Sequence, residues 1–276
     1  MLTLSLPRMR CAALTMALLA GAATATPALA DRYSEAVAHP GRTAADLKRD
    51  EIDHPAEVLR LAGIRPGMAV VDFLAADGYY SELLSYIVGP KGHVYLLNNT
   101  AYDQWSNNQW DMRLLGGRLP NVEHRTIDVH FLGFPVHSID AIVLIKVYHD
   151  LYWQPNGGPW PKINPDAVLT EIARVVKPGG ILLLVDHSAQ PDTGSSQAGT
   201  LHRIDENFAR RDFEKHGFVL VARSNVLRRP DDPRTLITYQ GEMLGKTDRF
   251  VMVFRRAGTR HAATRHPARH KAQAAH

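Results

Sequence analysis

The sequence predicts an α/β fold with a doubly wound, mostly parallel sheet, and three observations support this. Short apolar runs, typical of buried strands, alternate with amphipathic helical segments along most of the chain. Turns that contain glycine or proline separate these segments, so each strand and helix has a recognisable end. Residues 68–88 read as a strand, a turn of small residues and a helix, the order found at the start of nucleotide-type sites.

The stretch 68–88 is the element around which the rest is organised. Residues 68–71 are an unbroken apolar run, which suits a strand buried on both faces, and Asp72 closes it. Ala75, Ala76 and Gly78 then form a tight turn, and apolar residues at helical spacing continue as far as Gly89. Because ligands of such sheets bind at the carboxyl ends of the strands, we expect a ligand beside this turn.

The remaining elements follow the same alternation. A polar helical arm is expected over residues 31–62, with a helix that begins at Pro55 and buries an apolar face. Further strands are expected at 93–97, 122–127, 139–145, 181–185, 218–222 and 249–254, and further helices at 102–115, 167–176 and 204–216. The segments 153–161 and 188–200 are expected to be loops.

Both ends of the chain differ from the fold between them. Residues 1–30 combine Arg8 and Arg10 with a short apolar segment and an Ala-Leu-Ala cleavage site, which predicts a secretory signal peptide. We therefore expect export, to the periplasm or outside the cell, with no stable membrane span after cleavage. An uncleaved anchor and a downstream start codon, which would leave the protein cytosolic, are the alternatives. Residues 257–276, rich in Ala, Arg and His, are expected to be a disordered basic tail.

The net charge of the whole chain is misleading. It is +4, but the two ends carry the excess, and residues 31–256 are close to −2. A basic groove for nucleic acid is therefore not indicated. Cleavage would also remove Cys11, the only cysteine, which suits an oxidising compartment.

Several motifs in order resemble class I S-adenosylmethionine-dependent methyltransferases. They are Val71-Asp72 with Gly78-Tyr79-Tyr80, then Asp128-Val129, the apolar strand 139–145, and Lys177-Pro-Gly-Gly180 between a helix and a buried strand. The resemblance covers residues 56–255, most of the chain after the predicted signal peptide, and implies a domain at 63–256 with a Rossmann-like sheet of seven strands whose last strand is antiparallel. It also implies S-adenosylmethionine as the cofactor and a small-molecule acceptor. Residues 202–205 and 245–251 resemble a bacterial subgroup of methyltransferases that carry signal peptides.

The resemblance implies a set of cofactor-binding residues. Leu74, Ala76 and Gly78 occupy the positions of the usual glycine pattern, so two of the three positions depart from it. Asn98 stands where an acid usually holds the ribose hydroxyls, which removes charge assistance from that contact. The implied set is Asp72, Leu74, Ala76, Gly78, Asn98, Asp128, Val129 and Lys146, with Asp128 accepting from the adenine amino group beside Val129. A side chain added at Gly78 is expected to occupy ligand space.

The predicted catalytic residues follow the fourth strand, where acceptors sit in this family. His149 is the candidate general base, because its ordinary pKa lies near neutrality, and Tyr148 is expected beside it. The alternatives are a histidine that only holds the loop and a tyrosine that only packs. Asp186 with His187 is a second acid–base candidate. His202 with Arg203 could bind an anionic group of the substrate, and a surface salt bridge is the equal alternative.

Other site classes find no support in the sequence. The histidines show no paired spacing on one helix, so no metal site is predicted. A Gly-x-Ser-x-Gly elbow and a G-x-G-x-x-G turn are both missing. We therefore expect methyl transfer from S-adenosylmethionine to a small acceptor. The alternative, motivated by Leu74, Ala76 and Asn98, is an exported non-catalytic module that keeps the fold; the oligomeric state is left open.

Overall fold

The computed structural model describes residues 32–155 and 157–258. The predicted signal peptide, residues 1–30, and all but the first two residues of the predicted tail lie outside these ranges. Within the described ranges, no helix combines the length and the apolar character that crossing a membrane requires.

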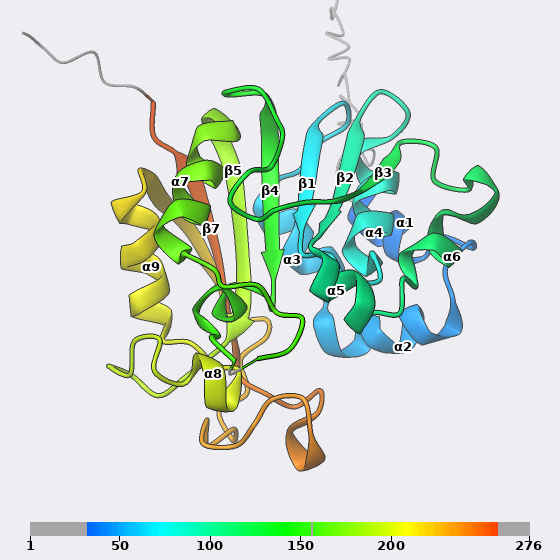
Figure 1. Ribbon diagram of the computed structural model, residues 1–276. Coiled ribbons are helices and arrows are strands. Elements are labelled where there is room, and N and C mark those ends of the chain that lie inside the picture. The colour runs from blue at the N-terminus through cyan, green and yellow to red at the C-terminus, as the bar shows by residue number, and fades with distance from the viewer. Residues whose placement is uncertain (1–31, 156, 259–276) are drawn as a thin grey trace, which may run out of the picture.

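A seven-stranded sheet forms the centre of the molecule (Figure 1). Its spatial order is β3-β2-β1-β4-β5-β7-β6, and only β7 runs antiparallel to its neighbours. The predicted fold, with its antiparallel last strand, is thereby confirmed. The strands are β1 Ala69–Phe73, β2 His93–Asn98, β3 Val122–Thr126, β4 Ile139–Ile145, β5 Val176–His187, β6 Phe218–Ser224 and β7 Arg249–Arg256.

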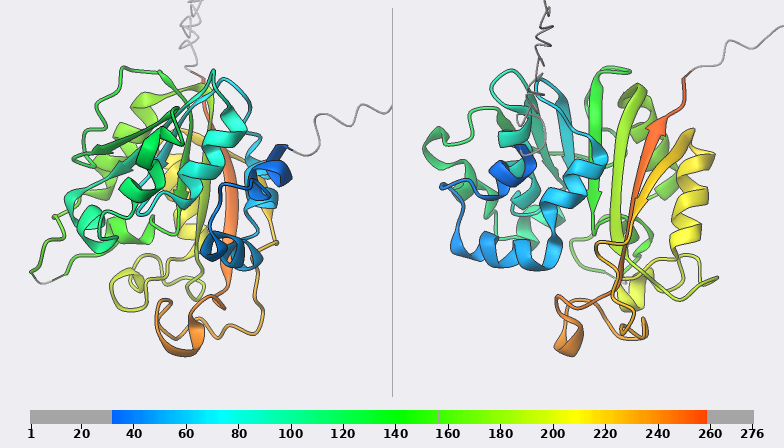
Figure 2. Two further views of the ribbon diagram at one scale, coloured as in Figure 1. Left: turned by 90° about the vertical axis from the view of Figure 1, so that its right-hand side faces the viewer. Right: turned by 180° about the vertical axis from the view of Figure 1, so that it is seen from behind.

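Helices cover both faces of this sheet, so each face has its own hydrophobic core. Apolar residues of α1 Arg32–Val37, α3 Pro55–Ala62 and α4 Tyr79–Val88 pack on one face, which the rear view of Figure 2 shows. Residues of α5 Thr100–Trp105, α7 Pro165–Val175 and α9 Glu206–Lys215 pack on the other. Successive residues of β1 divide between the cores, Val70 to the first and Val71 to the second, as the pleat of a strand requires.

Helix α7 ends just before the Lys-Pro-Gly-Gly block, and the block itself lies within the first residues of β5. A Cβ built on Gly180 would lie 2.7 Å from Val176 Cγ1 and 2.8 Å from the Lys177 carbonyl oxygen. Only glycine fits there, because the chain folds back closely on itself before it continues as a central strand.

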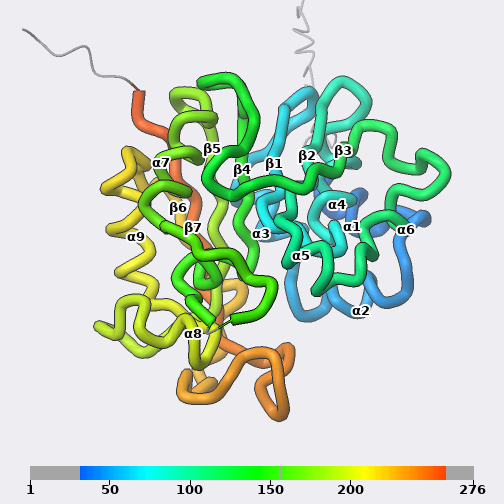
Figure 3. Tube along the Cα trace, viewed as in Figure 1, coloured from blue at the N-terminus to red at the C-terminus, as the bar shows by residue number. Residues whose placement is uncertain are grey.

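Two of the expected elements differ from the structure. The single helix predicted at 102–115 is two short ones, α5 and α6 Trp110–Leu114, which Figure 3 shows as separate turns. Asn107 and Asn108 lie between them with left-handed φ values of 51° and 52°, a conformation that asparagine tolerates and that ends a right-handed helix. The expected loop 188–200 includes the start of a further short helix, α8 Ala198–Leu201.

The carboxyl ends of the parallel strands meet at one edge of the sheet. Helix α2 Ala44–Asp53 and helix α5 lie along this edge in Figure 1. The short 3₁₀ helix η3 His149–Tyr152 follows β4 there, so every element that carries a predicted site residue reaches the same edge.

Candidate functional site

The turn between β1 and α4 has the backbone of a glycine-rich loop. Leu74, Ala76 and Gly78 have left-handed φ values of 53°, 54° and 78°, and these are the three positions of the glycine pattern. For leucine and alanine this conformation costs about 1–2 kcal/mol each. Strain of this kind persists only where the surroundings impose it, and it is concentrated at functional sites. The turn therefore has left-handed backbone at all three positions, although two of them are not glycine.

Gly78 is required for a reason other than the one expected from the sequence. A Cβ on this residue would lie 2.6 Å from Leu96 Cδ1 and 3.3 Å from Arg113 Cδ. The added side chain would thus collide with β2 and with a neighbouring arginine. The expectation that it would occupy ligand space is wrong, because the hydrogen that a Cβ would replace points toward Leu96 of the sheet.

Asn98 holds the loop in this structure. Its Oδ1 accepts from the backbone N–H of Ala76 at 2.9 Å, and its Nδ2 donates to the Ala76 carbonyl at 3.0 Å and to Asp103 Oδ1 at 2.8 Å. Asp103, on α5, also accepts from the Thr126 hydroxyl at 2.6 Å. Both amide hydrogens of Asn98 are therefore used, and its side chain is fully buried. The sequence reasoning missed Asp103, since nothing local marks a helix aspartate as the partner of a strand residue.

Asp72 is a buried carboxyl group at the end of β1. It is 3% exposed, and the Ser81 hydroxyl donates to its Oδ2 at 2.7 Å. Burial raises the pKa of Asp72 to about 7, and the Asp77 carboxylate acts in the same direction. Its charge therefore changes near neutral pH, and a cationic ligand group beside it would favour the ionised form.

Asp128 and Val129 sit side by side but in different surroundings. The Asp128 side chain is 70% exposed, and the backbone N–H of His130 donates to its Oδ1 at 2.9 Å. That hydrogen bond, together with the His130 ring, lowers the pKa of Asp128 below its ordinary value. Its Oδ2 accepts no hydrogen bond from any residue that the structure describes. Val129, in contrast, is buried in the hydrophobic core. Asp128 is thus an ionised, accessible acceptor.

Three apolar side chains beside these residues are buried. Leu74 and Val129 are each 1% exposed and Tyr102 is 7% exposed, and all three belong to one hydrophobic cluster. A surface cavity of about 710 Å³ lies at the opposite edge of the sheet, where Met68 and Asp140 line it near the amino ends of β1 and β4. The three side chains of Leu74, Tyr102 and Val129 thus pack in the same hydrophobic cluster as the loop.

Lys146 is paired with helix α2. Its Nζ lies 2.9 Å from Asp53 Oδ2, and Arg49 Nε lies 2.9 Å from the same oxygen, while Arg249 contacts the other carboxylate oxygen. Burial lowers the pKa of Lys146 to about 8, although Asp53 opposes this. Burial favours the neutral form of Asp53, but the cations Lys146, Arg49 and Arg249 hold the pKa of Asp53 well below its usual range. Lys146 therefore fastens α2 over the edge of the sheet, and the sequence did not indicate Asp53 as its partner.

His149 is held firmly by Asp186. Its Nδ1 lies 2.7 Å from Asp186 Oδ1, and its backbone N–H donates to Asp186 Oδ2 at 2.9 Å. Burial alone would lower the pKa of His149, but the carboxylates of Asp150 and Asp186 raise it to about 9. A histidine with that pKa is already protonated at neutral pH, which does not suit a general base.

Tyr148 and Arg203, two of the other candidates near His149, are each bonded to a different carboxylate. The Tyr148 hydroxyl donates to Asp212 Oδ2 at 2.6 Å on α9, its ring packs 5.1 Å from that of Phe213, and burial raises its pKa well above the ordinary value. Arg203 is fully buried, and its Nη1 and Nη2 donate to the two oxygens of Asp232 at 2.8 and 3.1 Å. The anionic-substrate role considered for Arg203 is wrong, because Asp232 already uses the guanidinium.

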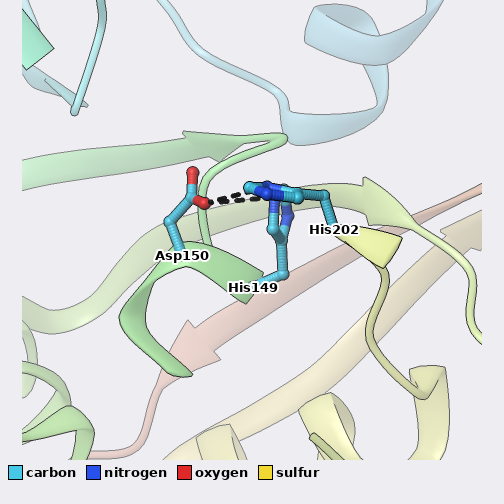
Figure 4. A group of neighbouring side chains, drawn as sticks. All are labelled: His149, Asp150 and His202. Atoms are coloured by element: carbon cyan, nitrogen blue, oxygen red, sulfur yellow. Dashed lines mark hydrogen bonds and ion pairs between the residues drawn. The ribbon is translucent and has the colours of Figure 1, made fainter. Parts of the chain in front are cut away.

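The structure instead brings three polar side chains together beside β4. His149 Nε2 lies 3.2 Å from His202 Nδ1 and 3.3 Å from Asp150 Oδ1, and these two atoms are 3.4 Å apart. Figure 4 shows the side chains pointing toward one another, the first two from η3 and His202 from the end of α8. In this His-Asp-His cluster, meaning His149, Asp150 and His202, one ligand-type atom of each side chain lies within 4.8 Å of the other two.

Comparisons with known proteins find similarity to methyltransferases. A family model described as a methyltransferase domain matches residues 75–184. Ubiquinone/menaquinone biosynthesis C-methyltransferase from Teredinibacter turnerae is 28% identical over 132 residues, which are 47% of each chain. The enzyme of the same name from Shewanella piezotolerans is 30% identical over 129 residues, 46% of this chain and 45% of the relative. This chain thus spans about half the length of the curated relatives it matches.

A solved structure extends the similarity to the whole fold. The SAM dependent methyltransferase from Aquifex aeolicus superimposes with a TM-score of 0.56 at 22% identity, covering 76% of this chain and 93% of that chain. Neither comparison favours a non-catalytic module.

Proposed function

We propose that this chain is a class I S-adenosylmethionine-dependent methyltransferase that methylates a small-molecule acceptor, and its fold and the methyltransferase-domain match at residues 75–184 support this. S-adenosylmethionine is the cofactor that this domain and fold imply. The observation that carries the proposal is the left-handed backbone at Leu74, Ala76 and Gly78, between the central strand and the helix that follows it. The chain keeps a costly conformation there at each position of the glycine pattern, which motivates a ligand-binding role for the loop.

The residues around the loop fit the polar parts of the cofactor. S-adenosylmethionine supplies a methyl group on a positively charged sulfur, so a carboxylate near that end of the molecule favours binding. Asp72 offers this carboxylate when it is ionised, and Asp128 offers an exposed acceptor for an amino group such as that of adenine. Binding requires Leu74, Tyr102 and Val129 to separate, and we expect α5, which carries Tyr102, to move with them.

The acceptor side of the site lies beyond β4. The His-Asp-His cluster is there, at the end of the strand next to β1. A fold of this kind contributes to the reaction mainly by holding the acceptor in line with the methyl group, which by itself supplies a large part of the rate enhancement.

The protein is also proposed to be exported and to belong to the subgroup of methyltransferases with signal peptides. The support is the pattern of residues 1–30 and the position of the only cysteine, Cys11, within it. Mass spectrometry of the protein from periplasmic and cytosolic fractions tests this. We expect a periplasmic or secreted chain that begins at Asp31; a cytosolic chain that retains Met1 would contradict export.

Titration calorimetry with S-adenosylmethionine tests the binding site. We expect heat of binding for the wild-type chain and an affinity roughly tenfold lower for Asp128→Ala, because that variant loses a charged acceptor. Asp166→Ala is the matched control, since this aspartate is also exposed and lies on α7, away from the loop. The control should bind as the wild type does.

Two results would contradict the proposal. If the wild-type chain gives no heat with millimolar cofactor, it has no such binding site. If the two variants bind with equal affinity, Asp128 does not contact the adenine end of the cofactor. Transfer of a labelled methyl group to any small acceptor then separates an enzyme from a non-catalytic module, because only the enzyme turns the cofactor over.

A further inference from the structure

We propose that the His-Asp-His cluster binds a divalent transition-metal ion, with zinc as the reference ion. The three ligand atoms are His149 Nε2, Asp150 Oδ1 and His202 Nδ1 (Figure 4). Two imidazole nitrogens and one carboxylate oxygen are a ligand set that zinc, iron and other borderline metals prefer.

The distances within the cluster suit metal ligands better than hydrogen bonds. The three atoms form a nearly equilateral triangle with sides of 3.2, 3.3 and 3.4 Å. Ligands about 2.0–2.1 Å from a tetrahedral zinc ion are about 3.3–3.4 Å from one another. A charge-assisted hydrogen bond between a histidine and a carboxylate is shorter, at about 2.7–2.9 Å. One ion just outside the plane of the triangle would contact all three atoms at ordinary bond lengths.

A second set of residues orients the ligands. Asp186 Oδ1 lies 2.7 Å from His149 Nδ1, so this carboxyl group orients the ring and holds a proton on Nδ1, and a bound ion would displace the proton on Nε2, which faces the triangle. The Tyr102 hydroxyl donates to Asp150 Oδ2 at 2.5 Å, which leaves Oδ1 as the inward oxygen. Carboxylate–histidine–metal arrangements of this kind are typical of protein metal sites.

His202 is held in place from the opposite side. Its backbone has a left-handed φ of 52°, and the buried Arg203–Asp232 ion pair fixes the next residue. Rings of Trp153 and Tyr239 lie 5.2 and 4.8 Å from its imidazole. The strained backbone of His202 thus holds its Nδ1 at the third corner of the triangle.

No metal site is predicted from the sequence because it contains no paired histidines at the spacing of one helix face. Here two ligands are adjacent in η3, and the third follows more than fifty residues later at the end of α8. The spacing therefore has no local signature, and only the fold assembles the set.

The site offers the ion three protein ligands, one fewer than a tetrahedral ion takes, so a fourth position is left for another ligand. The His202 side chain is 15% exposed, whereas those of Asp150 and His149 are 10% and 4% exposed. Three ligands with an open position are typical of catalytic rather than structural zinc. Resting here on the proposed function, we assign the open position to an oxygen or nitrogen of the methyl acceptor. His149 then acts as a ligand and not as the general base predicted from the sequence.

Metal titration of the full-length, untagged chain tests the site without any cofactor. The protein is stripped with a chelator and titrated with Zn²⁺ against a chromophoric competitor, and with Co²⁺ while the visible absorption is recorded. We expect one tightly bound equivalent and a Co²⁺ spectrum of a four- or five-coordinate site. The histidines of residues 259–276 can bind metal weakly, but they are the same in every variant.

Variants identify the ligands. His202→Asn keeps a residue that tolerates the left-handed conformation, and we expect it to lose the tight equivalent, with affinity at least a hundredfold lower. His93→Asn is the matched control, since His93 is a half-exposed histidine beside the carboxylate of Glu123, and it should bind as the wild type does. Asp186→Asn should weaken binding about 10- to 100-fold while circular dichroism shows a folded chain.

Two results would overturn the metal site. The first is a wild-type chain that binds no Zn²⁺ at micromolar concentration. The second is a folded His202→Asn variant that retains the tight equivalent. Both readouts are independent of methyl transfer, so the metal site and the proposed function can fail separately.

Discussion

Replacement of Asp72 by asparagine should change how the stability of the protein depends on pH. In the folded chain burial raises the pKa of Asp72 to about 7, whereas its ordinary value is 3.8. The folded state therefore holds a proton on Asp72 more tightly than the unfolded state does. This stabilises the fold fully below pH 3.8, and the stabilisation is lost as the pH rises toward 7. Asparagine cannot ionise, so the free energy of unfolding of the variant does not fall for this reason as the pH rises.

The size of the effect follows from the difference between the two pKa values. Each unit corresponds to about 1.4 kcal/mol, so the full shift is worth about 4 kcal/mol as an upper limit. Relative to the wild type, Asp72→Asn should gain stability between pH 4 and 8 by up to this amount. The Ser81 hydroxyl can still donate, at 2.7 Å in the wild type, to the amide oxygen of the variant.

Urea denaturation followed by circular dichroism at pH 4, 5, 6, 7 and 8 measures the free energy of unfolding of both chains. Asp111→Asn serves as the control, because this aspartate is exposed on α6 and should leave the pH dependence unchanged. Parallel curves for the wild type and Asp72→Asn would refute the reasoning, since they would mean that Asp72 titrates alike in the folded and unfolded states.

The titration of Asp72 also predicts how cofactor binding depends on pH. If the cationic cofactor binds the ionised form of Asp72, about one tenth of the wild-type chain is competent at pH 6 and about nine tenths at pH 8. The affinity for S-adenosylmethionine should then rise roughly ninefold between these pH values. In Asp72→Asn the rise should vanish, and its persistence there would assign it to another group.

The other predictions concern close packing and a buried ion pair. Gly78→Ala should lower the free energy of unfolding by about 2–4 kcal/mol, because its Cβ would meet Leu96 Cδ1 at 2.6 Å as well as requiring a φ of 78°. Gly117→Ala, with a φ of 69° and open space around it, should lose only about 1 kcal/mol, and equal losses in urea denaturation would disprove the collision. Arg203→Met should cost about 3 kcal/mol or more, because it leaves Asp232 charged and buried; a melting temperature within a degree of the wild type would contradict this.

The order of strands and helices could be read from the sequence because its causes are local. An apolar run such as 139–145 must be buried on both faces, and Lys177-Pro-Gly-Gly180 cannot continue a helix. Strands, turns and helices in alternation then leave few arrangements other than a doubly wound sheet. The edge where the site lies follows from the same rule, since the parallel strands all end there.

The partners of the site residues were settled only by the tertiary structure. Asn98 bonds to the loop and to Asp103, and Lys146 pairs with Asp53, ninety-three residues earlier. The resemblance to a family placed Asn98 and Lys146 in the site, but it could not show which atoms they contact. A side chain's position in the sequence indicates which edge it reaches, whereas its hydrogen bonds depend on elements brought in from elsewhere.

The His-Asp-His cluster illustrates the same division. The sequence by itself determined that His149 and Asp150 follow a central strand, at the edge where ligands bind. Folding alone brought His202 to them from the end of α8 and set the separations that suit a metal ion. Backbone pattern is encoded by neighbours in the chain, because strand and helix depend on local sterics and burial. Coordination geometry is a matter of tenths of an ångström between distant residues, and only the packed molecule fixes it.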